Sequence, residues 1–183
     1  MILENPRFQL IPAAPELAEA VCGYYVRNRE FLTPYDPRRE PVFFTPDYQR
    51  LLLAQDQAMC QAGSGHRFYI RLAEEPELVA GTVSLTSIVM GAFRSCFLGY
   101  KLDKDYLNRG LMTAAVGLVT DYAFSQLQLH RIEANVMPWN QASLRVVEKN
   151  GYEPEGLARE YLYINGRWED HLHMVKRNQA LRL

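Results

Sequence analysis

The chain has 183 residues, of which 48% are hydrophobic and 22% charged, and its formal net charge is −1. This composition predicts a single globular domain over 1–183, and the balanced charge argues against a broad surface for DNA or membranes. No stretch is apolar over the roughly 18 residues that a membrane span needs, the N-terminus has no signal-peptide pattern, and the three cysteines have no metal-ligand spacing. We therefore expect a cytoplasmic protein without a metal site, and we expect it to be a monomer or a weak dimer.

The first half of the chain predicts one strand, two helices and then three strands. Residues 7–13 alternate and end in proline, which is typical of a short strand, and helical spacing follows over 15–32. Four prolines make 33–46 a loop. A second helix over 47–63 begins at Asp47, which we expect to be its N-cap. Alternating residues then predict strands over 66–73, 78–91 and 95–102.

The second half of the chain contains a crossover unit and a hairpin. Asn165-Gly166 joins two alternating runs and predicts a type I′ turn. The strand–helix–strand unit over 95–137 needs a crossover, so its two strands should be parallel in an otherwise antiparallel α/β sheet. The predicted elements of this half are a helix over 110–126, a strand over 131–137, a short helix over 141–151 and hairpin strands over 157–164 and 167–175.

One stretch combines a positive charge, a glycine and the start of an apolar helix. Residues 106–115 read YLNRGLMTAA, and the helix begins next to Gly110. A helix N-terminus presents unpaired N–H groups and a partial positive charge, and glycine lets a ligand approach the backbone closely. The stretch therefore fits an anion site, typically for phosphate, with Arg109 facing either that phosphate or solvent. An ordinary helix start explains the same residues equally well.

With these features the sequence resembles the GNAT family of N-acetyltransferases, whose acyl-CoA loop opens the helix after the fourth strand. The family motif reads Gln or Arg, two residues, Gly, one residue, then Gly or Ala. The central glycine matches, whereas Leu107 and Met112 depart from the first and last positions and leave the backbone amides intact. The resemblance implies the GNAT fold, a mixed and mostly antiparallel sheet with a splayed parallel central strand pair, flanked by helices. It also implies acetyl-CoA as co-substrate, bound by Asn108, Arg109, Gly110, Leu111, Met112 and Thr113.

The second half of the chain resembles one branch of this family, the ribosomal-protein-alanine N-acetyltransferases of the RimJ/RimL type, and RimJ in particular. This resemblance implies that the acceptor is the N-terminal alanine of ribosomal protein five of the small subunit, with the ribosomal protein, and ribosomal particles, as partners. The matching features are HRI at 130–132, Asn140 followed by Ser143, NGYxxEG at 150–156, WxDH at 168–171, NREFLTPYDP at 28–37 and LGYKL at 98–102.

The resemblance also assigns roles around the expected strand opening. A backbone N–H of Lys101 or Leu102 would point at the thioester oxygen. Asn140 would bind the cofactor and Ser143 would donate toward the thiol sulfur, although a helix cap and an ordinary first turn explain both residues without a cofactor. A sister group uses a tyrosine as the acid at the position of Val147, which carries no proton, and this favours Ser143 as the donor.

The general base is left open between two glutamates and water. The sister group has a glutamate at the position of Asn135, whose amide accepts no proton. Glu133 lies two residues earlier on the same strand face, and Glu160 is an acidic position in the RimJ branch. Either glutamate is equally well a surface or ion-paired residue. A free α-amino group has a pKa of about 8, so a water chain would also suffice.

Two histidines and two tyrosines have weaker claims to a role at the site. His130 and His171 lack partners at ligand spacing, so we expect structural or surface roles. Tyr161 and Tyr163 share a strand face with Arg159, and they either line an acceptor tunnel or form an ordinary half-buried face.

The acceptor side is expected between two walls. Residues 15–63 form one wall and 157–175 the other, and an extended peptide with a small first residue would enter end-first between them. Glu160 and Asp170 would favour a basic substrate. Two alternatives stay open: the same cofactor with a small amine such as a polyamine, an amino acid or an aminoglycoside, or a ribosome-associated assembly factor whose acetyl transfer is incidental.

Overall fold

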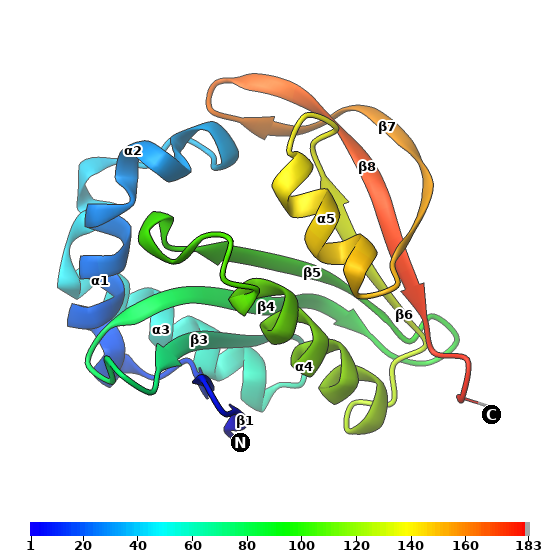
Figure 1. The fold of residues 1–183 in the computed structure, drawn as a ribbon, viewed down its shortest axis with the longest axis horizontal. Coiled ribbons are helices and arrows are strands. Elements are labelled where there is room, and N and C mark those ends of the chain that lie inside the picture. Colours follow the sequence, from blue (N-terminus) through cyan, green and yellow to red (C-terminus); the bar gives the residue numbers. More distant parts are fainter. Residues whose placement is uncertain (182–183) are drawn as a thin grey trace.

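One mixed sheet runs through the computed structural model, which describes residues 1–181 (Figure 1). Its 8 strands follow the order β1-β2-β3-β4-β5-β6-β8-β7, so both halves of the chain contribute to one sheet. Neighbouring strands are antiparallel except for the β5–β6 pair, which is parallel. The strands are β1 (Leu3–Asn5), β2 (Phe8–Pro12), β3 (His66–Leu72), β4 (Val79–Val89), β5 (Ser95–Leu102), β6 (Arg131–Val136), β7 (Glu153–Ile164) and β8 (Arg167–Arg177).

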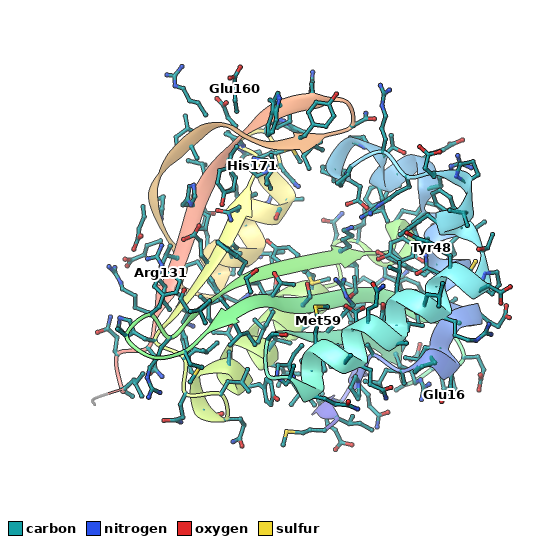
Figure 2. The ribbon with its side chains drawn as sticks, turned by 180° about the vertical axis from the view of Figure 1, so that it is seen from behind. Glu16, Tyr48, Met59, Arg131, Glu160 and His171 are labelled. Carbon is teal, nitrogen blue, oxygen red and sulfur yellow. The ribbon has the colours of Figure 1, made fainter. Side chains whose placement is uncertain are left out.

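Helices cover both faces of the sheet. Helices α1 and α3 pack on one face and α4 and α5 on the other, as Figures 1 and 2 show from opposite sides. Each face has its own core: Val21 and Leu53 are buried on the α1–α3 side, and Val116, Ile132 and Val147 on the α4–α5 side. The helices are α1 (Ala18–Arg27), α2 (Arg29–Leu32), α3 (Pro46–Gln61), α4 (Leu111–Ser125) and α5 (Gln141–Lys149).

The parallel pair is joined over a short length only. Its register runs from Ser95 opposite Arg131 to Phe97 opposite Glu133. Beyond Phe97 the described residues of the two strands form no further pairs, although β5 continues to Leu102. This confirms the predicted splayed parallel pair, and it leaves the second half of β5 with one edge that has no strand partner.

The helix predicted over 15–32 is interrupted at Asn28, which separates α1 from α2. Asn28 is fully buried, and its side chain donates to the Tyr24 carbonyl (2.9 Å) and accepts from the Lys104 N–H (2.9 Å). The interruption therefore ties the end of α1 to the segment after β5. Helical spacing does not reveal it, because Lys104 lies 76 residues further along the chain.

Two other boundaries differ from the prediction. Helix α3 is capped by Thr45, whose hydroxyl accepts from the Tyr48 N–H (3.4 Å), so the prediction of Asp47 as N-cap is wrong. Pro46 takes the first helical position because it has no N–H to pair, and this places the cap one residue before it. Strand β1 was not predicted, since its 3 residues are too few to show an alternating pattern.

The C-terminal hairpin begins earlier than predicted, because β7 already starts at Glu153. Its turn has positive φ at both Asn165 (45°) and Gly166 (89°), which confirms the predicted type I′ turn. The register shifts between Ala158 and Leu162, and such a bulge bends a strand. The hairpin curves so that its turn comes next to the segment that follows α2 (Figure 1).

Candidate active site

The free edge of β5 lies at the centre of the candidate site. Asp103 N–H donates to the Ala80 carbonyl of β4 (2.8 Å). Because residues of an antiparallel ladder alternate in direction, Lys101 also directs its N–H toward β4, whereas Leu102 and Tyr100 direct theirs away from it. Of the two backbone donors predicted for a thioester oxygen, the ladder therefore engages Lys101 and leaves Leu102 free.

The predicted anion loop leads into α4 with an exposed backbone. Asn108 (φ 60°) and Gly110 (φ 71°) are left-handed, and a Cβ added to Gly110 would meet no atom within 4 Å. The Ala114 N–H donates to the Gly110 carbonyl (3.1 Å) at the start of the helix. The N–H groups of residues 111–113 therefore form a free helix start, the arrangement that a pyrophosphate contact requires.

Polar contacts from distant parts of the chain hold this loop. Asp103 is fully buried and accepts from Arg27 Nε of α1 (2.5 Å) and from the Asp105 N–H (3.1 Å). Arg7, in the turn before β2, donates to the Arg109 carbonyl (2.7 Å). Arg7, Arg27 and Asp103 were not predicted, because no local pattern pairs residues so far apart.

Arg109 is oriented by its own loop. Its Nη2 donates to the Asp105 carbonyl (2.9 Å), and its guanidinium lies 5.0 Å from the centroid of the Tyr106 ring. The side chain is exposed. It therefore lies against the ring beside the free helix start, with its other N–H groups available to phosphate or water.

Asn140 and Ser143 lie at the start of α5. Asn140 Oδ1 accepts from the Ser143 N–H (3.1 Å), which confirms that Asn140 caps the helix. The phenol of Tyr100 on β5 donates to the Ser143 carbonyl (2.9 Å), and its oxygen lies 2.7 Å from Ser143 Oγ. Only the phenol can donate to the carbonyl, whereas either oxygen can be the donor in the shorter contact. The structure thus joins Ser143 to a tyrosine that sequence reasoning missed.

Tyr100 remains protonated over the physiological pH range. Burial raises the pKa of its phenol to about 12, and the hydrogen bond with Ser143 offsets only part of that effect. Val147, at the position of the sister group's tyrosine, is fully buried in the core. A phenol therefore approaches Ser143 from the neighbouring strand instead of from α5 itself.

Glu133 is an ion-paired residue. Its carboxylate accepts from Arg131 Nη2 (2.7 Å) and lies 2.5 Å from His173 Nδ1. Burial raises the pKa of this carboxyl, but the hydrogen bonds from Arg131 and His173 outweigh burial and lower it below the ordinary value of 4.5. A carboxylate stabilised in this way is a poor proton acceptor. Further along the strand, Asn135 Oδ1 is buried and has no hydrogen-bond partner within residues 1–181.

Glu160 lies on the outer edge of the hairpin, at the register shift in β7 (Figure 2). It is exposed, has a φ of 48°, and its N–H donates to Asp170 Oδ1 (2.8 Å). The structure therefore brings Glu160 and Asp170 together, but it forms no hydrogen bond between the Glu160 carboxylate and Ser143 or any other described residue. The positive φ also interrupts the strand alternation that would have placed Arg159 and Tyr161 on one face.

The remaining candidates divide between buried and surface positions. His171 is 3% exposed, burial lowers the pKa of its imidazole, and its Nδ1 lies 2.9 Å from the Glu169 carbonyl. His130 and Tyr163 are exposed, whereas the Tyr161 ring contacts His171. Residues 1–181 contain no group of three or more His, Cys, Asp or Glu side chains that could hold a metal ion. Nor is any helix in this part of the chain long and apolar enough to cross a membrane.

Two walls meet near the free end of β5. The Asn165 N–H in the hairpin turn donates to the Asp36 carbonyl (3.0 Å), and the Tyr35 ring lies 5.4 Å from the Trp139 ring in the β6–α5 loop. The Asp36 carboxylate also pairs with Lys101 Nζ at 2.6 Å. The segment after α2, the hairpin turn and the β6–α5 loop thus join around this end of β5.

The site combines three features: β5 and β6 part beyond Phe97, the start of α4 is free, and the Ser143 hydroxyl lies close to β5. Together they define an acyltransferase that binds acyl-CoA between two strands. Comparison with known proteins agrees with this class, since residues 7–153 match the family model described as acetyltransferase (GNAT) domain. The chain belongs to the GNAT family, and it is therefore an N-acetyltransferase that uses acetyl-CoA.

Three similar proteins support the family, and two of them support the predicted branch. The probable N-acetyltransferase YjcK of Bacillus subtilis is 44% identical over 154 residues, which cover 84% of each chain. The crystal structure of ribosomal-protein-S5-alanine acetyltransferase from Vibrio fischeri has a TM-score of 0.96 at 33% identity and covers 100% of both chains. Mycobacterium smegmatis RimJ, solved in complex with CoA-disulfide, has a TM-score of 0.90 at 28% identity and covers 100% of this chain and 88% of its own. The resemblance to the RimJ type is thereby confirmed.

Proposed function

We propose that this enzyme acetylates the N-terminal amine of a ribosomal protein, with alanine as the first residue and small-subunit protein five as the substrate. One observation carries the proposal for the acceptor: the hairpin turn and the segment after α2 touch near the free end of β5. An acceptor that enters end-first suits such an enclosure, and the activity named for the Vibrio fischeri protein supports alanine. We further propose that residues 1–183 act as one domain and that the enzyme works in the cytoplasm, where ribosomal proteins are made.

The cofactor side of the site fits acetyl-CoA, which supplies an acetyl group already activated as a thioester. The N–H groups at residues 111–113 bind the pyrophosphate, and the open space next to Gly110 lets it approach. The Leu102 N–H faces the thioester oxygen and stabilises the charge that develops there. Asn140 caps α5 through Oδ1 and keeps its Nδ2 hydrogens for the cofactor.

Ser143 and Tyr100 control the proton for the leaving sulfur. Ser143 donates its hydroxyl proton toward the sulfur and receives one from the phenol 2.7 Å away. Water returns a proton to the resulting Tyr100 phenolate before the next cycle. The phenol needs only to rotate its O–H from the Ser143 carbonyl to Ser143 Oγ, because both oxygens already lie within hydrogen-bond distance. A positioned acid of this kind typically contributes about 100-fold or more to a rate.

The acceptor amine needs no strong base. An α-amino group has a pKa of about 8, so part of it is neutral at physiological pH. Asn135 Oδ1 is buried and has no partner among the described residues, and it accepts an N–H of the amine and orients the lone pair. Water carries the released proton outward, and Glu160 acts as its acceptor at the exposed edge of the hairpin.

The experiment compares kcat/KM for three acceptors with acetyl-CoA: an alanine-first peptide from the ribosomal protein, the same peptide blocked at its N-terminus but carrying lysines, and spermidine. The proposal requires the free alanine-first peptide to be clearly preferred. Preference for spermidine would establish the small-amine alternative, and preference for the blocked peptide would establish lysine acetylation.

A further inference from the structure

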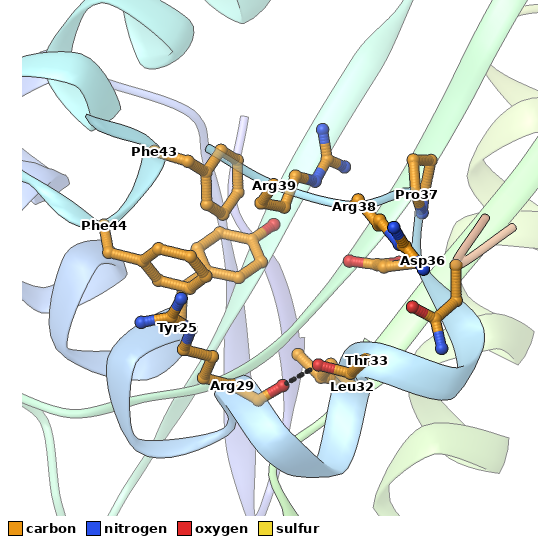
Figure 3. A pocket seen from close by; sticks show the side chains of 11 residues that line it. Tyr25, Arg29, Leu32, Thr33, Asp36, Pro37, Arg38, Arg39, Phe43 and Phe44 are labelled. Carbon is orange, nitrogen blue, oxygen red and sulfur yellow. Dashed lines mark hydrogen bonds between the residues drawn. The ribbon is translucent and has the colours of Figure 1, made fainter. Parts of the chain in front are cut away.

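A cavity of about 210 Å³ lies between α2, the segment that follows it and the hairpin turn (Figure 3). Arg29, Arg38 and Arg39 line it together with Phe43 and Phe44. None of these residues belongs to the cofactor loop or to α5, so the acetyl-transfer chemistry described above leaves the cavity without a role.

The three arginines share one feature, the lack of a partner. Within residues 1–181, their guanidinium groups take part in no ion pair and no hydrogen bond, although most other arginines of that range do. The one carboxylate in the cavity wall, that of Asp36, is paired with Lys101 Nζ at 2.6 Å. The cavity therefore carries an uncompensated positive charge and fits an anion.

Aromatic rings orient two of these guanidinium groups. Arg29 lies 4.5 Å from the centroid of the Phe44 ring and Arg39 lies 4.6 Å from that of Phe43. A guanidinium stacked on a ring keeps its N–H edge free and loses little further freedom when it binds an anion. Arg38 differs, because its guanidinium lies directly against Gly166 of the hairpin turn. A Cβ added to Gly166 would come within 2.8 Å of Arg38 Nη2. Arg38 therefore packs against the hairpin turn, whereas Arg29 and Arg39 lie on two different rings of the cavity wall.

The cavity adjoins the acceptor side of the site. Asn165 of the hairpin turn lines it and donates to the Asp36 carbonyl at 3.0 Å. Asp36 in turn is joined through Lys101 to the part of β5 that has no strand partner. An extended peptide advances about 3.3 Å per residue, so a peptide whose amine lies at β5 carries its next side chains toward the walls.

We propose that Arg29 and Arg39 form a subsite for an acidic side chain of the acceptor protein, a few residues after the acetylated amine. The inference rests on the proposed function, and it replaces the expectation from Glu160 and Asp170 that the acceptor is basic. A carboxylate matches the N–H edges of guanidinium groups, and such charge-assisted hydrogen bonds are about twice as strong as neutral ones.

The test measures peptide binding by calorimetry in the presence of CoA. The probes are alanine-first peptides with one glutamate at successive positions, each compared with its glutamine twin. We expect one position at which glutamate binds about tenfold more tightly than glutamine, and loss of that preference in Arg29→Gln and Arg39→Gln. Arg71→Gln is the matched control, because Arg71 also lacks a partner within the described residues but lies outside the cavity. Thermal unfolding checks that each variant is folded.

The outcomes separate this subsite from the proposed function. Equal affinity for glutamate and glutamine at every position overturns the subsite, even if the alanine-first peptides are acetylated. A glutamate preference that disappears in the two variants supports it, even if acetylation of the same peptides fails and the proposed function falls. Inorganic phosphate is tested as a second probe, and binding of phosphate without any preference for glutamate assigns the cavity to a phosphate ligand and overturns the proposal.

Discussion

Ser143 Oγ lies 2.7 Å from the phenol oxygen of Tyr100, and under the proposed function it also faces the leaving sulfur of acetyl-CoA. The 2.7 Å contact holds the serine hydroxyl toward Tyr100 of β5. An alcohol alone is a weak acid, so its hydrogen bond with a phenol gives the site a better proton donor. Two substitutions test this arrangement.

Removing the hydroxyl in Ser143→Ala should lower kcat about 100-fold and leave the KM for acetyl-CoA nearly unchanged. The reason is that protonation of the leaving thiolate matters in the transition state and little in the ground state. Steady-state kinetics with free-thiol detection measure both constants. A variant with the original kcat would leave Ser143 with only its place in the first turn of α5.

Tyr100→Phe keeps the ring and removes its hydroxyl. We expect kcat to fall about tenfold, because the hydrogen bond to Ser143 Oγ is lost. Combined with Ser143→Ala, it should cause little further loss, because the two groups act as one unit. Tyr152→Phe is the control, since it removes another buried phenol, which contacts Thr120 Oγ1 at 2.8 Å and not Ser143. Equal losses in both phenylalanine variants would indicate a purely structural role for Tyr100.

Glu133→Gln tests the ion pair on β6 through its pH dependence. The pKa of this carboxyl is lowered in the folded state. The stability that the ion pair adds is therefore present above the ordinary pKa of 4.5, and it is lost as pH falls through the lower pKa of the folded state. We expect the variant to be about 1–2 kcal/mol less stable at neutral pH, given partial solvent access. Denaturant unfolding should show this difference vanishing in strong acid. A difference that is independent of pH would contradict the ion-pair role.

At the scale of elements, the start of α4 is the part that the fold prepares for a ligand. The loop before it contains two left-handed residues and is held from outside by Arg7 Nη1 on the Arg109 carbonyl (2.7 Å). Farther back, the fully buried Asp103 anchors the preceding segment to α1 through Arg27. The helix start is thereby fixed before any ligand binds, which reduces the ordering cost of binding.

Gly110→Val should weaken CoA binding by about tenfold or more, because a branched side chain would occupy the approach to the free N–H groups. The substitution also strains the backbone, since Gly110 has a φ of 71°. Gly91→Val is the matched control: Gly91 has a φ of 70°, lies in the β4–β5 turn, and likewise has nothing within 4 Å of an added Cβ. Calorimetric titration with CoA should separate the two variants. Similar affinities would contradict the loop assignment.

At the scale of the whole molecule, the proposed acceptor side is assembled from segments that lie far apart in the chain. The segment after α2 contacts the hairpin turn through Asp36 and Asn165 and contacts the β6–α5 loop through Tyr35 and Trp139. Under the proposed function, acetyl-CoA and the acceptor are therefore bound by different parts of the fold. Changes at the contacts between these segments should affect the acceptor more than the cofactor.

Trp139→Ala removes the ring contact with Tyr35, and we expect the KM for the peptide to rise about 2–10-fold while the affinity for CoA stays unchanged. Trp139→Phe keeps an aromatic ring at this place and should restore most of the original KM. Acceptor kinetics and CoA titration of both variants measure the two effects. A parallel loss of CoA affinity would show that this contact holds the cofactor side as well.

The sequence by itself determined the features that depend on neighbouring residues. Periodicity placed most strands and helices, Asn165-Gly166 specified the turn, and Asn140 identified a helix cap. Each of these patterns depends only on a few consecutive residues. The crossover over 95–137 even determined the parallel pair. The motif around Gly110 located the start of α4.

Only the tertiary structure decided which distant groups meet. Tyr100 reaches Ser143 across 43 residues, and Arg27 reaches Asp103 across 76. The bulge in β7 moved Glu160 to the outer edge of the hairpin, since one irregular residue shifts the alternation of the residues that follow it. Side-chain partners are fixed by packing and sheet register, and these depend on contacts between elements that no local pattern records.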